Sequence, residues 1–285
     1  MWKLQLPDNT NSMTDLITAL TYVNGTSKHA LTEDEKDIIK GLYLEYESLH
    51  GTYSLNLIGD TLSNETNNAI HDGYSEVQEE GRLKDLRSRL MLQANRCPCC
   101  GINAVTDMDH HLPRSVFKAL AVYSSNLVPL CHKCNNKKRV VTGEDPEKRF
   151  VHVYYDNVPD DIQFFKATSE IVENGLKIKF FVEQVNGISD ELFQKLKFQV
   201  KKVKLNKRLQ KEINIFLLSF VTNIENVYIG NNPSESVKVF LEANHKTFKN
   251  NMGLNDWRTV LLNSLANNDT FCNGGFRCIL SSSLS

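Results

Sequence analysis

Apolar side chains recur at helical spacing in several stretches of the chain. Thr32 and Glu35 have the spacing of a capping box, and the apolar positions after them predict a helix over 33–49. Residues 1–30 are polar with little periodicity, so we expect a loose segment or a docking arm there. The same pattern predicts further helices over 75–94, over 189–220 in one or two pieces, and over 234–248 and 254–267.

Two short runs of β-branched and aromatic residues predict strands, one over 150–155 (FVHVYY) and one over 176–182 (LKIKFFV). We therefore expect an α+β chain in which a small motif is embedded in mainly helical flanking regions. Its parts are an acidic, mainly helical N-terminal region over 1–94, a motif region over 95–142, and a mainly helical α+β C-terminal region over 143–285.

Composition indicates a globular protein with an uneven charge distribution. The chain has 285 residues, of which 41% are hydrophobic and 24% charged, enough to bury a sizeable core. Residues 1–80 hold 14 acidic and 4 basic residues although the whole chain has a net charge of −1, so the remainder is basic and suits phosphate groups. The sequence shows neither a signal peptide nor an apolar run of membrane-spanning length. We therefore expect a cytoplasmic protein with no membrane partner.

Four cysteines in two Cys-x-x-Cys pairs predict a zinc site. Cys97 pairs with Cys100, and Cys131 pairs with Cys134. Close pairs in a cytosolic chain favour metal binding over disulfides, and two such turns supply the four thiolates of a tetrahedral zinc site. Cys99 is a rival ligand, but its spacing is poorer. Because four thiolates leave no open position for water, we expect the zinc to be structural.

Residue types suited to phosphodiester hydrolysis lie between the two cysteine pairs and just after the second. The segment 107–113 reads DMDHHLP, Asn126 precedes the second pair, and Asn135 and Lys138 follow it. A neutral imidazole can take a proton from water near pH 7, because the pKa of histidine is about 6.5. Carboxylate and amide oxygens suit Mg²⁺ or Mn²⁺. These residues together predict metal-assisted hydrolysis.

The order of these elements resembles the HNH endonuclease family. The matching pattern is Asp-His-x-x-Pro, then Asn-Leu before Cys-x-x-Cys, then Asn-x-x-Lys, and it covers residues 97–138. The resemblance implies a ββα-metal motif, in which two strands and a helix hold one divalent cation. The long flanks around this motif also resemble stand-alone bacterial antiphage-defence nucleases that act with an ATPase partner.

The resemblance implies a role for each matching residue. Asp109 and Asn135 would bind the catalytic Mg²⁺ or Mn²⁺, and His110 would be the general base. Asn126 would hold the loop between the elements, and Lys138 would face a phosphate.

Two assignments have rivals in the sequence. His111 stands where the family commonly has an apolar residue, but adjacent strand residues point to opposite faces, so we predict His110 as the base. Asn136 is a rival to Asn135, because the sequence does not fix the register of the helix.

Charge favours nucleic acid as the partner of the motif region. No Asp or Glu occurs from residue 110 through residue 143, whereas six Lys and Arg do. We expect the nucleic acid to be contacted by Arg114, Lys137, Lys138 and Arg139. Eight further Lys and Arg lie between residues 195 and 211, as a second phosphate-binding surface or an ordinary solvated helix face.

We therefore expect a metal-dependent endonuclease, with DNA favoured over RNA as its substrate. The alternative is a zinc-ribbon protein that binds nucleic acid or acts as a scaffold without catalysis. A ribbon has no need of Asp109, His110, Asn126 and Asn135, which favours the nuclease.

Overall fold

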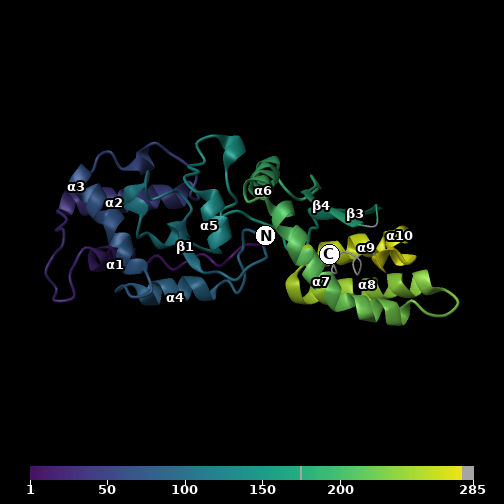
Figure 1. The fold of residues 1–285 in the computed structure, drawn as a ribbon. Coiled ribbons are helices and arrows are strands. Elements are labelled where there is room, and N and C mark those ends of the chain that lie inside the picture. Colours follow the sequence, from purple (N-terminus) through teal and green to yellow (C-terminus); the bar gives the residue numbers. More distant parts are fainter. Residues whose placement is uncertain (174, 278–285) are drawn as a thin grey trace. The chain divides into compact units, whose positions relative to one another are not determined.

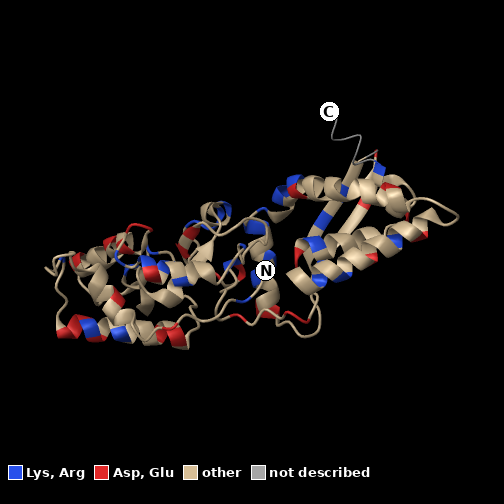
Figure 2. Cartoon of the chain, turned by 90° about the horizontal axis from the view of Figure 1, so that it is seen from below, with Lys and Arg blue, Asp and Glu red and all other residues tan. Residues whose placement is uncertain are grey.

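The computed structural model describes residues 1–173 and 175–277. The chain divides into two compact units, one formed by residues 2–157 and the other by residues 158–285 with Met1. Both combine helices with a two-stranded antiparallel sheet (Figure 1). The prediction of an α+β chain is confirmed at this level. Acidic and basic positions are mixed along the helices of both units (Figure 2). Among the described residues, no helix has the length and apolar character needed to cross a membrane.

The first unit combines short α-helices with long connecting segments. The helices are α1 (Ser12–Ala19), α2 (Glu33–Ser48), α3 (Asn64–Gly73), α4 (Lys84–Leu92) and α5 (His132–Lys138). The predicted capping box begins α2, because the Thr32 side chain accepts a hydrogen bond from Glu35 N and the Glu35 carboxylate accepts one from Thr32 N. The expectation of a loose segment over 1–30 is wrong, since α1 buries Leu16 and Ala19 completely.

The helix expected over 75–94 is interrupted. A short 3-10 turn covers Tyr74–Val77, and α4 begins only at Lys84. Between them the backbone turns tightly: a Cβ placed on Gly81 would lie 2.2 Å from the carbonyl oxygen of Glu76. The close approach therefore requires glycine at this position and ends the helical path.

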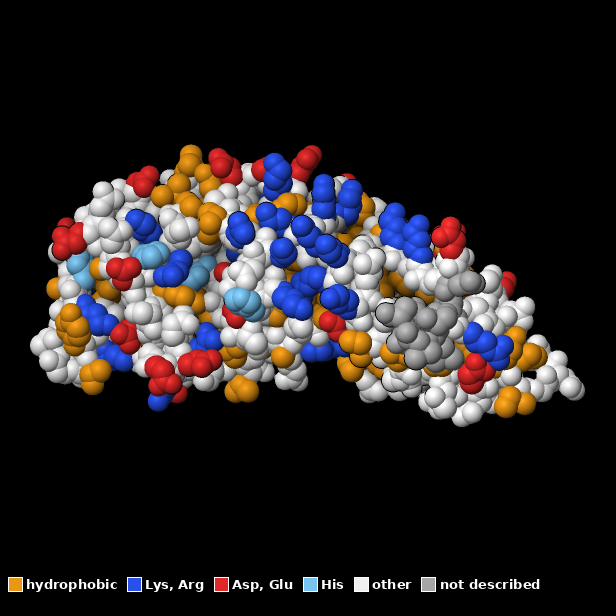
Figure 3. Space-filling model, viewed as in Figure 1, with side chains coloured by type: hydrophobic (Ala, Val, Ile, Leu, Met, Phe, Trp, Pro, Cys, Tyr) orange, Lys and Arg blue, Asp and Glu red, His pale blue; other side chains and the backbone are white. Residues whose placement is uncertain are grey.

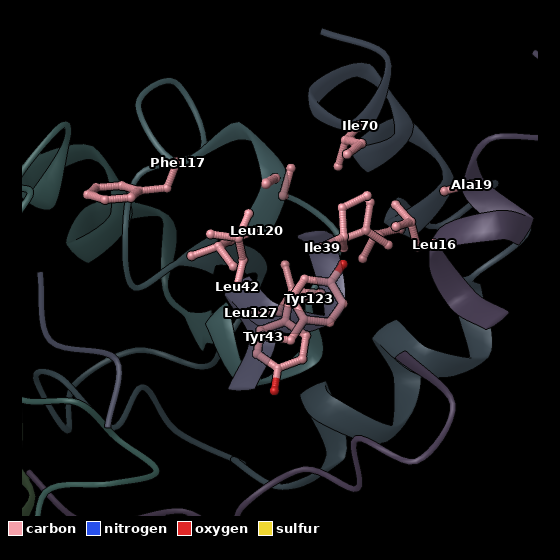
Figure 4. Packing of buried hydrophobic residues seen from close by; sticks show 14 of the residues in the cluster. Leu16, Ala19, Ile39, Leu42, Tyr43, Ile70, Phe117, Leu120, Tyr123 and Leu127 are labelled. Atoms are coloured by element: carbon pink, nitrogen blue, oxygen red, sulfur yellow. The ribbon is translucent and has the colours of Figure 1, made fainter. Parts of the chain in front are cut away.

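The core of the first unit lies between α1, α2, α3 and the loop that follows Phe117 (Figure 4). Ile39 from α2 and Ile70 from α3 are fully buried within it. Tyr43 of α2 stacks on Tyr123 of the loop, with ring centroids 4.0 Å apart. Burial of an aliphatic or aromatic side chain of this size contributes about 1.5–3 kcal/mol. The core therefore fixes the loop that connects the two strands of this unit.

A strand–strand–helix unit follows the cysteine-rich turn. Strand β1 (Asp107–His110) pairs antiparallel with β2 (Leu127–Leu130), so that Asp107 lies opposite Leu130 and His110 opposite Leu127. Helix α5 begins two residues after β2 ends. Every residue of β2 is buried, so both faces of this strand pack against other parts of the chain.

The second unit packs helices against a hairpin of β3 (Phe165–Val172) and β4 (Gly175–Val182). Its helices are α6 (Asp190–Lys202), α7 (Leu205–Val227), α8 (Pro233–Met252), α9 (Trp257–Ala266) and α10 (Asp269–Cys272). The predicted strand over 176–182 and the helices predicted after residue 189 are confirmed.

The strand predicted over 150–155, at the end of the first unit, is wrong: a turn forms there, in which His152 N donates to the Asp156 carboxylate. In the sequence, a short run of apolar residues has the same pattern whether it forms a buried strand or another buried segment.

Candidate functional site

Four buried cysteines form a compact cluster in the first unit. The Sγ atoms of Cys97, Cys100, Cys131 and Cys134 all lie within 4.8 Å of one another. Those of Cys100 and Cys131 are 3.8 Å apart. Tetrahedral zinc with bonds of about 2.3 Å separates its sulfur ligands by about 3.8 Å, so the cluster has the size to hold a metal ion such as zinc. Cys99 is also buried but does not belong to the cluster.

Local backbone structure presents these thiols. Gly101 takes a φ of +68° and donates from its N–H to the carbonyl of Cys97 at 2.8 Å, which closes the first turn. Cys131 is the N-cap residue of α5, and Cys134 N donates to the Cys131 carbonyl at 2.9 Å. An ion bound by these thiols would therefore join the turn that precedes β1 to the first turn of α5.

Alternate residues of β1 face α5. Asp107 accepts hydrogen bonds at Oδ2 from Asn135 Nδ2 at 2.9 Å and from His132 Nδ1 at 3.0 Å. Burial raises the pKa of Asp107, but the hydrogen bonds from Asn135, Thr106 and His132 outweigh it and hold the pKa below its ordinary value. Asn136, the rival of Asn135, is exposed and bonds to the ring of His132. Asn135 is thus the asparagine that α5 turns toward the strand.

Asp109 lies two residues further along the same face of β1. Its Oδ2 atom is 3.3 Å from the amine of Lys138, which also donates to the carbonyl of His110 at 2.5 Å. The contact with Lys138 is an ion pair without hydrogen-bond geometry, so the buried Oδ2 atom receives no hydrogen bond from the described residues. Lys138 is only 4% exposed. In this structure its amine therefore neutralises Asp109, where the resemblance implied contact with a phosphate.

His110 points to the opposite face of β1, into the interior. Its side chain is buried beside the Tyr74 ring, with centroids 4.5 Å apart. Its Nε2 atom is 2.9 Å from the carbonyl of Ala121. A carbonyl only accepts, so Nε2 carries the hydrogen and Nδ1 is the basic atom. Burial lowers the pKa of His110 to about 3, so the imidazole is neutral at pH 7.

Asn126 holds the loop that connects β1 to β2. Its Nδ2 atom donates to the carbonyls of Leu112 at 3.0 Å and Leu120 at 3.2 Å, and its Oδ1 atom accepts from Leu112 N at 2.8 Å. The hydroxyl of Tyr46 donates to the same Oδ1 atom at 3.2 Å. Because Leu120 precedes Ala121, the Asn126 side chain also fixes the carbonyl that orients His110.

His111 lies apart from the face that carries Asp109. Its ring packs on His152, with centroids 3.9 Å apart. His152 Nε2 is 2.9 Å from the hydroxyl of Tyr46. Tyr46 therefore links the His111 side of the loop to Asn126, and this arrangement suits packing rather than proton transfer.

The predicted nucleic-acid contacts differ in exposure. Lys137 and Arg139 are exposed at the end of α5. Figure 3 shows exposed Lys and Arg side chains on the surface of the first unit. Arg114 is half-buried, with its guanidinium 4.7 Å from the centroid of the Tyr74 ring and one nitrogen donating to the carbonyl of His71 at 3.1 Å.

Sequence reasoning missed Asp107 and Tyr46 as part of this site. Asp107 had a signal, since residues i and i+2 of a strand share a face and Asp109 was already singled out. Tyr46 had none, because it lies 80 residues from its partner Asn126.

Two oxygen atoms at α5 and β1 suit a hard divalent cation. Asp109 Oδ2 is a buried carboxylate oxygen without a hydrogen bond. Asn135 uses its Nδ2 atom on Asp107, which leaves its amide oxygen for another partner. Carboxylate and amide oxygens are ligands that Mg²⁺ and Mn²⁺ accept, so the residues fit such an ion in chemistry.

Comparison with known proteins identifies one distant relative. Protein ea31 of Escherichia phage lambda is 27% identical over 201 residues, which are 65% of this chain and 66% of that protein. The matched region thus spans slightly less than two thirds of the relative. The chain matches no protein-family model, and no solved structure matches it.

Proposed function

We propose that the chain is a metal-dependent endonuclease of the HNH type that hydrolyses phosphodiester bonds of nucleic acid, with DNA as its substrate. The observation that carries the proposal is the strand–strand–helix unit, in which β1 carries the adjacent residues Asp109 and His110 on its two faces and the facing helix α5 carries Asn135. The four-cysteine cluster stabilises this unit by joining the turn before β1 to α5.

His110 is the general base of the proposed reaction. Its Nε2–H donates to the Ala121 carbonyl, so Nδ1 is left to take a proton from the attacking water. Burial keeps the imidazole neutral at pH 7, the form that can accept a proton, but it also makes His110 a weaker base than a free histidine. Asn126 supports this role, because it holds the backbone next to the Ala121 carbonyl.

Asp109 and Asn135 would hold the Mg²⁺ or Mn²⁺ ion. Such an ion supplies Lewis acidity at the scissile phosphate and stabilises the leaving oxygen. Asp107 fixes the amide of Asn135 by accepting from its nitrogen, so that the amide oxygen is the atom available to a cation. Lys138 supplies positive charge beside Asp109.

A plasmid-cleavage assay with Mg²⁺ or Mn²⁺ tests the proposal. We expect His110→Ala to lower the cleavage rate at least about 100-fold, since general-base catalysis contributes about 10²–10⁴-fold. His111→Ala is the matched control and should keep most of the activity. Full activity of His110→Ala would place the catalytic base elsewhere and overturn the assignment.

One observation favours the alternative of a zinc-containing nucleic-acid-binding or scaffolding protein. Lys138 already neutralises Asp109, as expected for a carboxylate with a structural role. This alternative predicts nucleic-acid binding without hydrolysis at any concentration of Mg²⁺ or Mn²⁺. The same plasmid assay, combined with a binding assay, separates the two functions.

A further inference from the structure

The second unit contains a groove of about 490 Å³ between β4, the end of α6 and the start of α7. Its apolar part includes the half-buried rings of Phe181 and Phe193. Its lining also includes four exposed lysines, which are Lys197, Lys201, Lys204 and Lys207. No Asp or Glu belongs to the lining. The groove therefore offers aromatic surface next to concentrated positive charge.

Two other lysines of the same unit are ion-paired, unlike the four that line the groove. Lys195 on α6 pairs with Glu191 at 2.9 Å, and Lys166 on β3 lies 3.8 Å from Glu183. By contrast, no ion pair involves a groove lysine within the described part of the chain. Lys197 and Lys201 are one helical turn apart, a spacing at which like charges destabilise a helix. Like charges without counter-charges do not stabilise the helix, so their placement is better explained by the binding of an anionic ligand.

The walls of the groove are tied together by the protein itself. Asn206, in the first turn of α7, accepts from Phe180 N at 2.7 Å and donates to the Phe180 carbonyl at 2.8 Å. Lys204 joins α6 to α7 with a φ of +52°, a conformation that L-residues seldom adopt. On the wall formed by α6, the amine of Lys197 lies 5.1 Å from the centroid of the Phe193 ring. Cations and aromatic rings are thus held side by side before any ligand arrives.

We propose that this groove binds single-stranded nucleic acid. Lysines can neutralise successive phosphates of a strand, while phenyl rings offer flat apolar faces on which unpaired bases stack. An acidic peptide would match the charge of the lysines, but its carboxylates would not stack on the phenyl rings of Phe181 and Phe193. A free phosphate would not need the apolar surface. A volume of about 300–1,000 Å³ is usual for ligand-binding pockets, and this groove lies within that range. The proposal concerns binding and does not depend on hydrolysis.

Binding is tested with a fluorescein-labelled single-stranded oligodeoxythymidylate and the full-length chain carrying His110→Ala, without added Mg²⁺ or Mn²⁺. Fluorescence anisotropy over a salt series gives the affinity and its salt dependence. For the double variant Lys197→Ala with Lys201→Ala we expect weaker binding. The slope of log affinity against log salt should fall by about 1.4, since each lost contact with a single strand removes about 0.7. The matched control is Lys246→Ala with Lys249→Ala on α8, which should leave both quantities unchanged.

A second variant tests the aromatic contact separately. Phe193→Leu keeps an apolar side chain but removes the ring, so we expect about tenfold weaker binding with an unchanged salt slope. Circular dichroism of each variant checks that the fold is retained.

Binding equal to that of the parent in both groove variants would overturn the proposal. Displacement of the oligonucleotide by polyglutamate at equal charge concentration would also overturn it, in favour of an acidic protein partner. Groove-dependent binding without any cleavage by the wild type would support this inference and refute the nuclease.

Discussion

Asp107 and Asn135 are joined by a hydrogen bond of 2.9 Å between β1 and α5. This bond places the polar face of the helix over the polar face of the strand and sets which asparagine faces inward. The carboxylate uses the amide nitrogen and leaves the amide oxygen for a metal ion or water. In the proposed metal site Asp107 would therefore be a positioning residue, which touches neither the cation nor the substrate.

Removal of this carboxylate should weaken the proposed metal site without unfolding it. We expect Asp107→Ala to lower activity or Mg²⁺ affinity about 10- to 100-fold, the usual effect of losing a group that orients a metal ligand. The activity should be measured as a function of Mg²⁺ concentration. Asp107→Asn is the informative companion, since its amide oxygen can still accept from Asn135 and should preserve more activity. Equal loss in both variants would point to a requirement for the charge itself.

The cysteine cluster predicts a metal-dependent fold. Cys131→Ser should lose the bound metal and destabilise the first unit strongly, because structural zinc sites contribute about 10–16 kcal/mol of apparent binding energy in small zinc-binding peptides. Cys99→Ser is the matched control: this thiol is equally buried but lies outside the cluster. Elemental analysis of the purified variants gives the metal content, and thermal melting gives the stability. Retention of the metal by Cys131→Ser would contradict a four-thiolate site.

The capping box of α2 predicts a stability that depends on pH. Hydrogen bonds from Thr66 and Thr32 hold the pKa of Glu35 below its ordinary value of 4.5. A carboxylate with a lowered folded-state pKa stabilises the fold above its unfolded-state pKa, and this contribution is lost as the pH falls through the folded-state pKa. Because Glu35 is only half-buried, we expect Glu35→Gln to cost only about 0.5 kcal/mol at pH 7 and less below pH 4. Urea unfolding at several pH values measures the difference, with exposed Glu80→Gln as the control; a constant cost across pH would argue against the charged cap.

Local patterns predicted well the features that depend on local structure. The two Cys-x-x-Cys turns determine their own geometry, and the capping box at Thr32 determines where α2 begins. The pairings at β1 were not predictable in the same way. Alternation along the strand puts Asp107 and Asp109 on one face, but the offset between β1 and α5 decides which of them meets Asn135. That offset depends on the backbone path between β2 and α5, and no pattern in the sequence predicts this path.

The ion pair between Asp109 and Lys138 allows the nuclease and the binding-only protein to be distinguished by stability alone. Removing the amine in Lys138→Met leaves a buried carboxylate without its counter-charge, which costs about 3–5 kcal/mol for a fully buried pair and less here, where the Asp109 side chain is 16% exposed. If Asp109 is a ligand of a divalent cation, Mg²⁺ should restore much of the lost stability of Lys138→Met, because the ion replaces the missing charge.

The measurement is thermal unfolding of the wild type and of Lys138→Met over a range of Mg²⁺ concentrations. Lys137→Met is the matched control, since Lys137 directly precedes Lys138 in α5 but is exposed. This variant should melt like the wild type. The double variant Asp109→Asn with Lys138→Met should lose the response to Mg²⁺, because it lacks the carboxylate that is proposed to bind the ion. A Lys138→Met protein that Mg²⁺ fails to stabilise would show that Asp109 serves the fold rather than a cation, and would favour the binding-only alternative.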